Sequence, residues 1–185
     1  MSTTALLIID LQNDYFPGGR FPLVGTEEAA AKAGDLLAAA RAAGAPVVHV
    51  RHEMTGDEAP FFERGTKGAE IHASLTPLGG EPVVVKEAVN AFLNTDLDAL
   101  LKGREVGSLV IVGAMSHMCV DAATRAALDL GYEVTLAHDA TATLDLSFGG
   151  KDVPAASVQT ALMAALEFAG ANVVPANVAA EALTG

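Results

Sequence analysis

Three polar side chains, each placed at the end of a short apolar run, are the residues best able to do chemistry in this chain. Asp10 follows ALLII, Lys86 follows PVVV, and the only cysteine, Cys119, comes shortly after LVIV. Apolar runs of this length are typical of strands buried on both faces of a parallel sheet. Ligands of such sheets bind beyond the carboxyl ends of the strands. The sequence therefore predicts that a carboxylate, an ammonium and a thiol share one cleft.

Those three groups are sufficient for acyl transfer on an amide-like bond. The thiolate of cysteine is the nucleophile, and we expect Lys86 and a helix N-terminus near Cys119 to lower the pKa of the thiol and make its alkylation fast at neutral pH. Asp10 can take the thiol proton and pass it to a leaving amine. Backbone N–H groups between Met115 and Cys119 can bind the oxyanion.

Strand-like runs alternate with helical patterns along the chain, which predicts an α/β fold with an open, mostly parallel sheet and helices on both faces. Helices are expected over 26–43, 96–102, 119–130 and 154–169, and residues 147–152 are expected to form a loop. No linker or internal repeat is found, so residues 1–185 are predicted to form one domain of three α-β-α layers. The six expected strands are Ala5–Ile9, Pro46–Val50, Pro82–Val85, Leu109–Val112, Glu133–Ala137 and Asn172–Val174.

Composition excludes several classes of partner. The chain has 11 basic and 23 acidic residues and a net charge of −12, so it would be repelled by nucleic acids and anionic membranes. A single cysteine cannot form an internal disulfide. No signal peptide is recognised, and no apolar run approaches the roughly 20 residues of a membrane helix. A cytoplasmic protein acting on a small molecule is expected.

Three ordered segments resemble the isochorismatase-like cysteine hydrolases, with a similarity that extends from Ala5 to about Val174. They are DLQNDY at 10–15, KEAVNAF at 86–92 and GAMSHMCV at 113–120. The resemblance implies a six-stranded parallel sheet flanked by helices and a homodimer or homotetramer. It also implies a catalytic triad of Asp10, Lys86 and Cys119. A cis peptide bond is implied between Ala114 and Met115. The backbone N–H groups of Met115 and Cys119 are implied to form an oxyanion hole.

The family that these segments resemble contains two chemistries. Isochorismatases hydrolyse a vinyl ether, and several lack the cysteine, whereas nicotinamidases and carbamoylsarcosine amidases use the cysteine on C–N bonds. Cys119 therefore favours hydrolysis of an amide, lactam, carbamoyl or ureido bond through a thioester. Vinyl-ether hydrolysis using Asp10 and a non-catalytic binding protein remain as alternatives.

Neither a metal nor a cofactor is expected. Nicotinamidases bind a metal through an Asp and a His two residues apart after the second strand, with a further His downstream. Here His52 and His72 are present, but no carboxylate stands in the required place. Two histidines alone are a weak metal signal.

Four further residues are candidates for contact with the substrate. His52 should lie near the end of the second strand, Ser116 and His117 precede the cysteine, and Phe16 lies in the loop after Asp10. Each also has a structural alternative, which for Phe16 is to anchor its loop. Gln12 and Asp14 are expected to brace the same loop and Lys86, and the identity of the substrate is left open.

Two other functions are disfavoured. A serine triad of Ser116, His138 and Asp139 lacks the G-x-S-x-G turn of serine hydrolases. A nucleotide- or flavin-binding protein would need G-x-G-x-x-G after the first strand or a phosphate-binding loop, and neither is found.

Overall fold

A single parallel sheet forms the centre of the computed structural model, which describes residues 3–56 and 59–184. Its strand order is β3-β2-β1-β4-β5-β8, and every neighbouring pair is parallel. The predicted six-stranded parallel sheet is therefore confirmed. The first and last residues of the predicted domain lie outside the described residues. The strands are β1 (Thr3–Ile9), β2 (Val47–His52), β3 (Val83–Lys86), β4 (Val106–Ala114), β5 (Glu133–Ala142) and β8 (Asn172–Val174).

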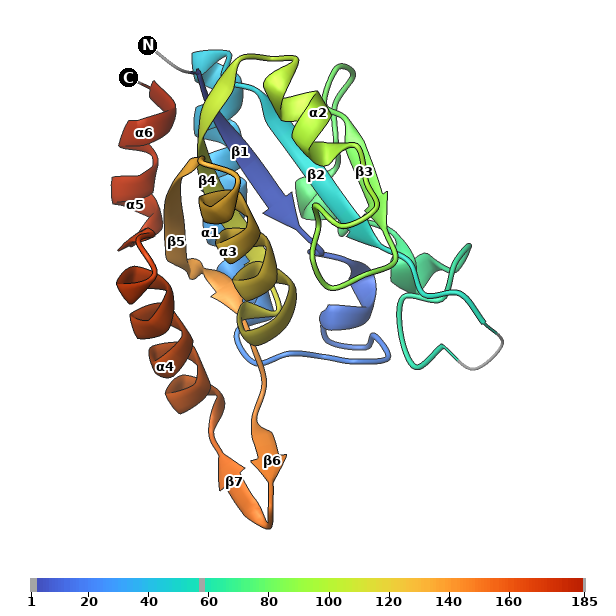
Figure 1. The fold of residues 1–185 in the computed structure, drawn as a ribbon. Coiled ribbons are helices and arrows are strands. Elements are labelled where there is room, and N and C mark those ends of the chain that lie inside the picture. The colour runs from blue at the N-terminus through green and yellow to red at the C-terminus, as the bar shows by residue number, and fades with distance from the viewer. Residues whose placement is uncertain (1–2, 57–58, 185) are drawn as a thin grey trace.

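Helices cover both faces of this sheet (Figure 1). One face packs against α1 (Thr26–Ala43), α5 (Ala176–Ala179) and α6 (Glu181–Thr184). The opposite face packs against α2 (Leu97–Lys102), α3 (Asp121–Asp129) and α4 (Ala155–Phe168). No helix within the described part of the chain is long and apolar enough to cross a membrane.

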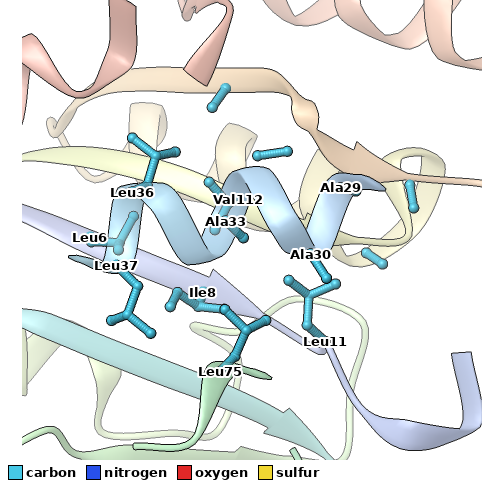
Figure 2. Packing of buried hydrophobic residues seen from close by; sticks show 14 of the residues in the cluster. Leu6, Ile8, Leu11, Ala29, Ala30, Ala33, Leu36, Leu37, Leu75 and Val112 are labelled. Carbon is cyan, nitrogen blue, oxygen red and sulfur yellow. The ribbon is translucent and has the colours of Figure 1, made fainter. Parts of the chain in front are cut away.

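The apolar residues of strand β1 pack on both faces of the sheet. Successive side chains of a strand point to opposite sides. Leu6 and Ile8 pack in the cluster that contains α1, and Leu7 packs in the cluster that contains α2 and α3. Figure 2 shows Ala33 and other small residues of α1 above Leu6 and Ile8. These alanines let α1 lie close to the sheet and bury the Leu6 and Ile8 side of β1, while α2 and α3 lie over the Leu7 side.

The connections after β1 and β4 diverge, and this divergence sets the position of the site. β1 leads to β2 on one side, while β4 pairs with the other side of β1 and leads outward to β5. In open α/β sheets, ligands bind where neighbouring strands diverge in this way. Asp10 follows β1, and Cys119 lies beyond the end of β4.

The structure differs from the prediction at a hairpin. β6 (Leu146–Phe148) and β7 (Lys151–Val153) form an antiparallel pair where a loop was expected. Gly149 and Gly150 join the strands with φ of 60° and 74°, a conformation that favours glycine in two-residue hairpin turns. In the sequence, the pair Gly149 and Gly150 is the feature that could have predicted this hairpin. Each of its strands is too short and too polar to be recognised as a strand from its sequence. Figure 1 shows this hairpin projecting from the body of the molecule.

Other boundaries were also wrong: β4 spans Val106–Ala114 rather than Leu109–Val112, and β2 ends at His52 rather than at Val50. β5 continues beyond Ala137 because its pairing with β4 shifts from Ile111↔Leu136 to Gly113↔Thr141. The helix expected from Cys119 begins instead as a π-helical turn, η4 (Ser116–Val120), and α3 follows at Asp121. Short 3-10 turns interrupt the loops: η1 (Asn13–Tyr15), η2 (Lys67–Ala69) and η3 (Ala73–Leu75).

Candidate active site

Asp10, Lys86 and Cys119 meet in a buried cluster at the carboxyl ends of β1, β3 and β4. Nζ of Lys86 lies 2.8 Å from Oδ2 of Asp10 and 3.3 Å from Sγ of Cys119. The three residues are 0%, 1% and 3% exposed, respectively. Burying charges costs several kcal/mol unless they are closely paired, and such groups concentrate at functional sites. The cluster is therefore the candidate active site.

Backbone geometry at the ends of β1 and β4 positions these groups. Asp10 has φ of 50°, a left-handed conformation that costs a residue other than glycine about 1–3 kcal/mol and is frequent at active sites. On β4, Gly113 has φ of 136°, and a Cβ added there would lie 2.1 Å from the carbonyl oxygen of Ile9. Glycine at this position thus allows the two strands to approach directly before the site. The peptide bond that follows, Ala114–Met115, is cis.

Lys86 has two further partners, which connect the cluster to a cavity. Its Nζ lies 2.8 Å from Nδ1 of His52 and donates to the carbonyl oxygen of Ala88 at 3.0 Å. His52 and Lys86 are paired directly across β2 and β3. His52 and Ala88 also line a cavity of about 720 Å³. His52 and Ala88 therefore contact both this cavity and, through Lys86, the buried cluster.

His52 is held as a neutral ring. Burial and the charge of Lys86 lower the pKa of its imidazole. Because Nδ1 faces the ammonium, it acts as the acceptor, and the ring proton belongs on Nε2. The Gln12 amide fixes the backbone of His52, since Oε1 accepts from its N–H and Nε2 donates to its carbonyl oxygen, both at 2.8 Å. Asp14 accepts from the N–H groups of Arg20 and Phe62, so its carboxylate holds the loop. Within the described residues, the partners of the Lys86 side chain are Asp10, His52, Ala88 and Cys119, and they include neither Gln12 nor Asp14.

The thiol differs from the prediction in its ionisation. Burial, followed by the charge of Asp10, raises the pKa of Cys119, and the opposing effect of Lys86 is smaller. This direction is opposite to the lowering of the thiol pKa that the sequence predicted, and rapid alkylation of Cys119 at neutral pH stays a prediction. Attack by this thiol requires a base at the moment of reaction. Oδ1 of Asp10 is buried without a hydrogen-bond partner among the described residues, so it is available to accept that proton.

The loop before Cys119 provides a candidate oxyanion hole. The carbonyl oxygen of Met115 accepts from the N–H groups of Met118 and Val120, each at 3.1 Å, and this closes the π-helical turn. Within residues 3–56 and 59–184, the N–H of Met115 itself has no hydrogen-bond acceptor. It is therefore available to a ligand, and the oxyanion hole of Met115 and Cys119 stays a prediction.

Three of the predicted substrate contacts lie elsewhere. Ser116 donates to the carbonyl oxygen of Ala142 at 3.1 Å, and Nδ1 of His117 lies 2.7 Å from Oγ1 of Thr143, so both tie η4 to the end of β5. Phe16 stacks on His72 with ring centroids 3.8 Å apart and lines a separate hollow of about 380 Å³. Only His52 of the four candidates lines the cavity beside the cluster.

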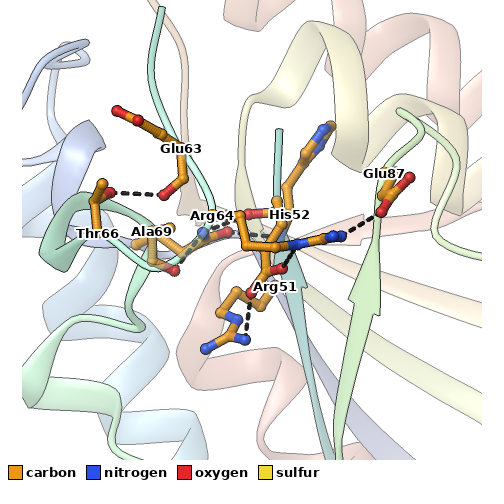
Figure 3. Close-up of polar contacts among 9 residues, drawn as sticks. Arg51, His52, Glu63, Arg64, Thr66, Ala69 and Glu87 are labelled. Carbon is orange, nitrogen blue, oxygen red and sulfur yellow. Dashed lines mark hydrogen bonds and ion pairs between the residues drawn. The ribbon is translucent and has the colours of Figure 1, made fainter. Parts of the chain in front are cut away.

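Charged pairs form one wall of that cavity. Glu53 accepts from Arg51 at 2.5 Å and from Arg64 at 2.7 Å. Arg64 also bonds Glu87, as Figure 3 shows. Both carboxylates line the cavity, and both are paired with guanidinium groups. Their charge is therefore balanced locally.

Comparison with known proteins establishes the family of the chain. The Isochorismatase domain matches residues 4–174. The chain belongs to the isochorismatase family. An uncharacterized member, YddQ of Bacillus subtilis (strain 168), is 50% identical over 164 residues, which are 89% of this chain and 91% of that protein. A crystal structure assigned to the isochorismatase hydrolases, from Oleispira antarctica, has a TM-score of 0.93 and 57% identity and covers 100% of this chain and 97% of its own.

One relative with a named activity is also similar. Ureidoacrylate amidohydrolase RutB of Rhizobium rhizogenes (strain K84 / ATCC BAA-868) is 30% identical over 180 residues, which cover 80% of this chain and 73% of that protein. The chain is therefore an isochorismatase-family hydrolase.

The sequence did not single out two aromatic residues beside the cluster of this isochorismatase-family protein. The rings of Tyr15 and Phe62 have centroids 4.4 Å apart. Burial, then the charges of Asp10 and Cys119, raise the pKa of Tyr15, which keeps its hydroxyl protonated near the site. The available signal for Tyr15 was its place at the end of the segment DLQNDY.

Proposed function

We propose that this protein is a cysteine hydrolase that cleaves a C–N bond of a small amide, lactam, carbamoyl or ureido compound through a thioester. The observation that carries the proposal is the position of Lys86, whose ammonium contacts both the Asp10 carboxylate and the Cys119 sulfur at 2.8 and 3.3 Å. A base, a cation and a nucleophile within one buried cluster are the groups that amide cleavage requires. The similarity to an amidohydrolase supports the C–N bond as the target.

Acylation begins with removal of the thiol proton. Asp10 takes this proton while Sγ of Cys119 forms a bond to the carbonyl carbon of the substrate. Negative charge moves to the carbonyl oxygen, which accepts hydrogen bonds from the N–H groups of Met115 and Cys119. The oxyanion then collapses, the C–N bond breaks, and Asp10 passes its proton to the leaving nitrogen.

Deacylation repeats the same proton transfers with water. Asp10 removes a proton from a water molecule that attacks the thioester carbon. Collapse of the second tetrahedral intermediate breaks the C–S bond, and Asp10 returns the proton to sulfur. Lys86 stabilises the negative charge that appears on sulfur before attack and after release.

The cavity next to His52 restricts the substrate to a small molecule. Its volume of about 720 Å³ lies in the usual range of small-molecule sites, roughly 300–1,000 Å³. Its acidic side chains Glu53 and Glu87 are paired with arginine. A neutral amide therefore suits this cavity better than a strongly charged compound.

Release of ammonia or amine from a panel of small amides and ureido compounds tests the proposal. For any substrate that wild type cleaves, Cys119→Ala should lower kcat/KM by roughly 10³-fold or more, because the thioester cannot form. Acyl-enzyme trapped by acid quenching should appear as an added mass on Cys119. Val85→Ala, an exposed change on β3, serves as the control.

Two results would contradict cysteine chemistry. One is full C–N hydrolysis by the Cys119→Ala protein. The other is vinyl-ether cleavage that depends on Asp10 and persists in Cys119→Ala, which would favour the isochorismatase reaction.

A further inference from the structure

Asp10, His52 and Cys119 form a set of metal-binding side chains arranged around Lys86. Their ligand atoms, a carboxylate oxygen, an imidazole nitrogen and a sulfur, all lie within 4.8 Å of one another, and all three residues are buried. Nζ of Lys86 lies 2.8 Å from Asp10, 2.8 Å from His52 and 3.3 Å from Cys119. The same three groups that can bind a metal ion therefore already surround one cation, the ammonium of Lys86.

The donor set suits zinc and related thiophilic ions. Carboxylate, imidazole and thiolate are the usual zinc ligands, and three protein ligands with one open position are typical of exchangeable zinc sites. Bonds from zinc to these atoms are about 2.0–2.3 Å, so each ligand atom would move inward from its place around Nζ by roughly 1 Å or less. The carbonyl oxygen of Ala88, 3.0 Å from Nζ, lies close enough to contribute to the fourth position.

A second observation points to a cation ligand at this place. Oδ1 of Asp10 is buried and accepts no hydrogen bond from a nitrogen or oxygen donor within the described part of the chain. A buried carboxylate oxygen without such a donor is costly. A metal ion bound through both oxygens of this carboxylate would satisfy it.

We propose that Zn²⁺ or a similar thiophilic divalent cation binds Asp10, His52 and Cys119 by displacing the ammonium of Lys86, and thereby inhibits the enzyme. Binding exchanges the thiol proton of Cys119 for the metal, and the proton is released to solvent. Occupied sulfur and carboxylate can act neither as nucleophile nor as base. The inhibition rests on the proposed cysteine mechanism, whereas the binding does not.

Lys86 sets the affinity of this site. In wild type the metal must displace an ammonium from a buried ion pair, and breaking such a pair is strongly unfavourable. Lys86→Met removes the competing cation and leaves the three ligands. We expect Lys86→Met to bind Co²⁺, a spectroscopic substitute for zinc, ~100-fold or more tightly than wild type.

Titration with Co²⁺ tests this inference without any need for turnover. The Lys86→Met protein should develop a thiolate-to-cobalt charge-transfer band and the visible bands of tetrahedral cobalt. Adding His52→Ala or Cys119→Ala to Lys86→Met should weaken or abolish these bands. Lys102→Met, which removes an exposed ammonium, is the matched control and should behave as wild type. A folded Lys86→Met protein that binds Co²⁺ no more tightly than wild type would refute the inference.

A second measurement applies if Lys86→Met does not fold. In the otherwise wild-type protein, Cd²⁺ should protect Cys119 from alkylation at alkaline pH, as read by mass spectrometry, and His52→Ala should remove the protection. Equal protection of both proteins, or of neither, would refute the three-ligand site. Because neither assay measures hydrolysis, these results are separate from the Cys119→Ala test of the reaction.

Discussion

The carboxylate of Asp10 acts on Cys119 in two opposite ways. As a base it would take the thiol proton, but as a neighbouring anion it raises the pKa of that thiol. Lys86 lies between them and has the opposite electrostatic effect on the sulfur. Neutralising the two residues should therefore change thiol reactivity in opposite directions, while turnover falls in both cases.

Replacement of Asp10 by Asn should uncouple these two properties. Turnover should fall by roughly 10²–10⁴-fold, because the general base is lost. Alkylation of Cys119 by iodoacetamide at neutral pH should become faster, since the anion that raises the thiol pKa is gone while Lys86 remains. Rates measured across a pH series give the pKa directly. Asp129→Asn, at an exposed position, is the control, and slower alkylation of Asp10→Asn would contradict the assignment of charges.

Replacement of Lys86 by Met should have a different signature. Turnover should fall as well, but the alkylation profile of Cys119 should move to higher pH, because the cation that favours the thiolate is removed. The change also leaves Asp10 buried without its partner, which should lower the free energy of unfolding by about 3–5 kcal/mol. Urea denaturation measures this loss. An unchanged alkylation profile would remove Lys86 from the site.

Sequence reasoning identified the three central residues because each follows an apolar run at the same edge of a parallel sheet. It did not identify the contact between His52 and Lys86, because that contact depends on the lateral order of strands and on the β2–β3 register. It also predicted a lowering of the thiol pKa, whereas burial raises it. The direction of this shift depends on the depth of burial, which no local pattern of residues specifies.

Among the secondary-structure elements, α1 and the segment that leads into β3 are joined by a partly buried ion pair. Glu81 accepts from Nε and Nη2 of Arg41 at 2.7 and 2.8 Å, and it also contacts Nε2 of His49 at 3.1 Å. The guanidinium lowers the pKa of Glu81 to about 2. Burial lowers the pKa of His49. Both groups therefore link the stability of this edge of the sheet to pH.

Stability should fall in two stages as the pH decreases. Both groups bind a proton more weakly in the folded state, so their contributions are complete above the unfolded pKa and are lost below it. The first loss begins near the ordinary pKa of histidine, about 6.5, and His49 shares it with His52, His72 and His117, whose pKa values are lowered by burial as well. The second lies between about 4.5 and about 2 and belongs to Glu81. Urea denaturation at a series of pH values should resolve both stages.

Glu81→Gln identifies the second stage. It should lower the free energy of unfolding by about 2–3 kcal/mol at neutral pH and remove most of the decrease below pH 4.5. Glu28→Gln, at an exposed position of α1, should change neither. Retention of the full acid-induced decrease in Glu81→Gln would assign that stage to other groups.

The order of strands and helices was largely predictable, because runs of four or five apolar residues bounded by Gly, Pro or charge stand out in sequence. The β6–β7 hairpin was not predicted, since its strands have three residues each and show no alternation. The extension of β5 depends on a register shift against β4. Neither feature is encoded in the periodicity of a single segment.

For the whole molecule, the projecting hairpin and the adjacent helix suggest association of copies of the chain. Phe148 in β6 is 91% exposed and Phe168 at the end of α4 is 96% exposed. A two-stranded hairpin is marginally stable in water by itself, and exposed apolar surface commonly marks an interface. We expect a homodimer or homotetramer in which the hairpin contacts another copy.

Light scattering coupled to gel filtration tests this expectation. Wild type should elute with the mass of two or four chains, and Phe148→Ser should weaken association and lower the mass at low protein concentration. Leu78→Ser, which changes a 56% exposed apolar residue far along the sequence, should leave the mass unchanged. A monomeric wild type would contradict the expectation.

Gly113 has a consequence for how new activities can arise in this protein. Since any side chain there would strike the carbonyl of Ile9, the strand that leads to Asp10 and the strand that leads to Met115 and Cys119 are fixed against each other. One part of the proposed reaction cannot be adjusted without disturbing the other. Directed evolution toward new substrates should therefore accumulate its successful substitutions in the cavity wall, at Met54, Ala59 and Val89, and leave this junction intact.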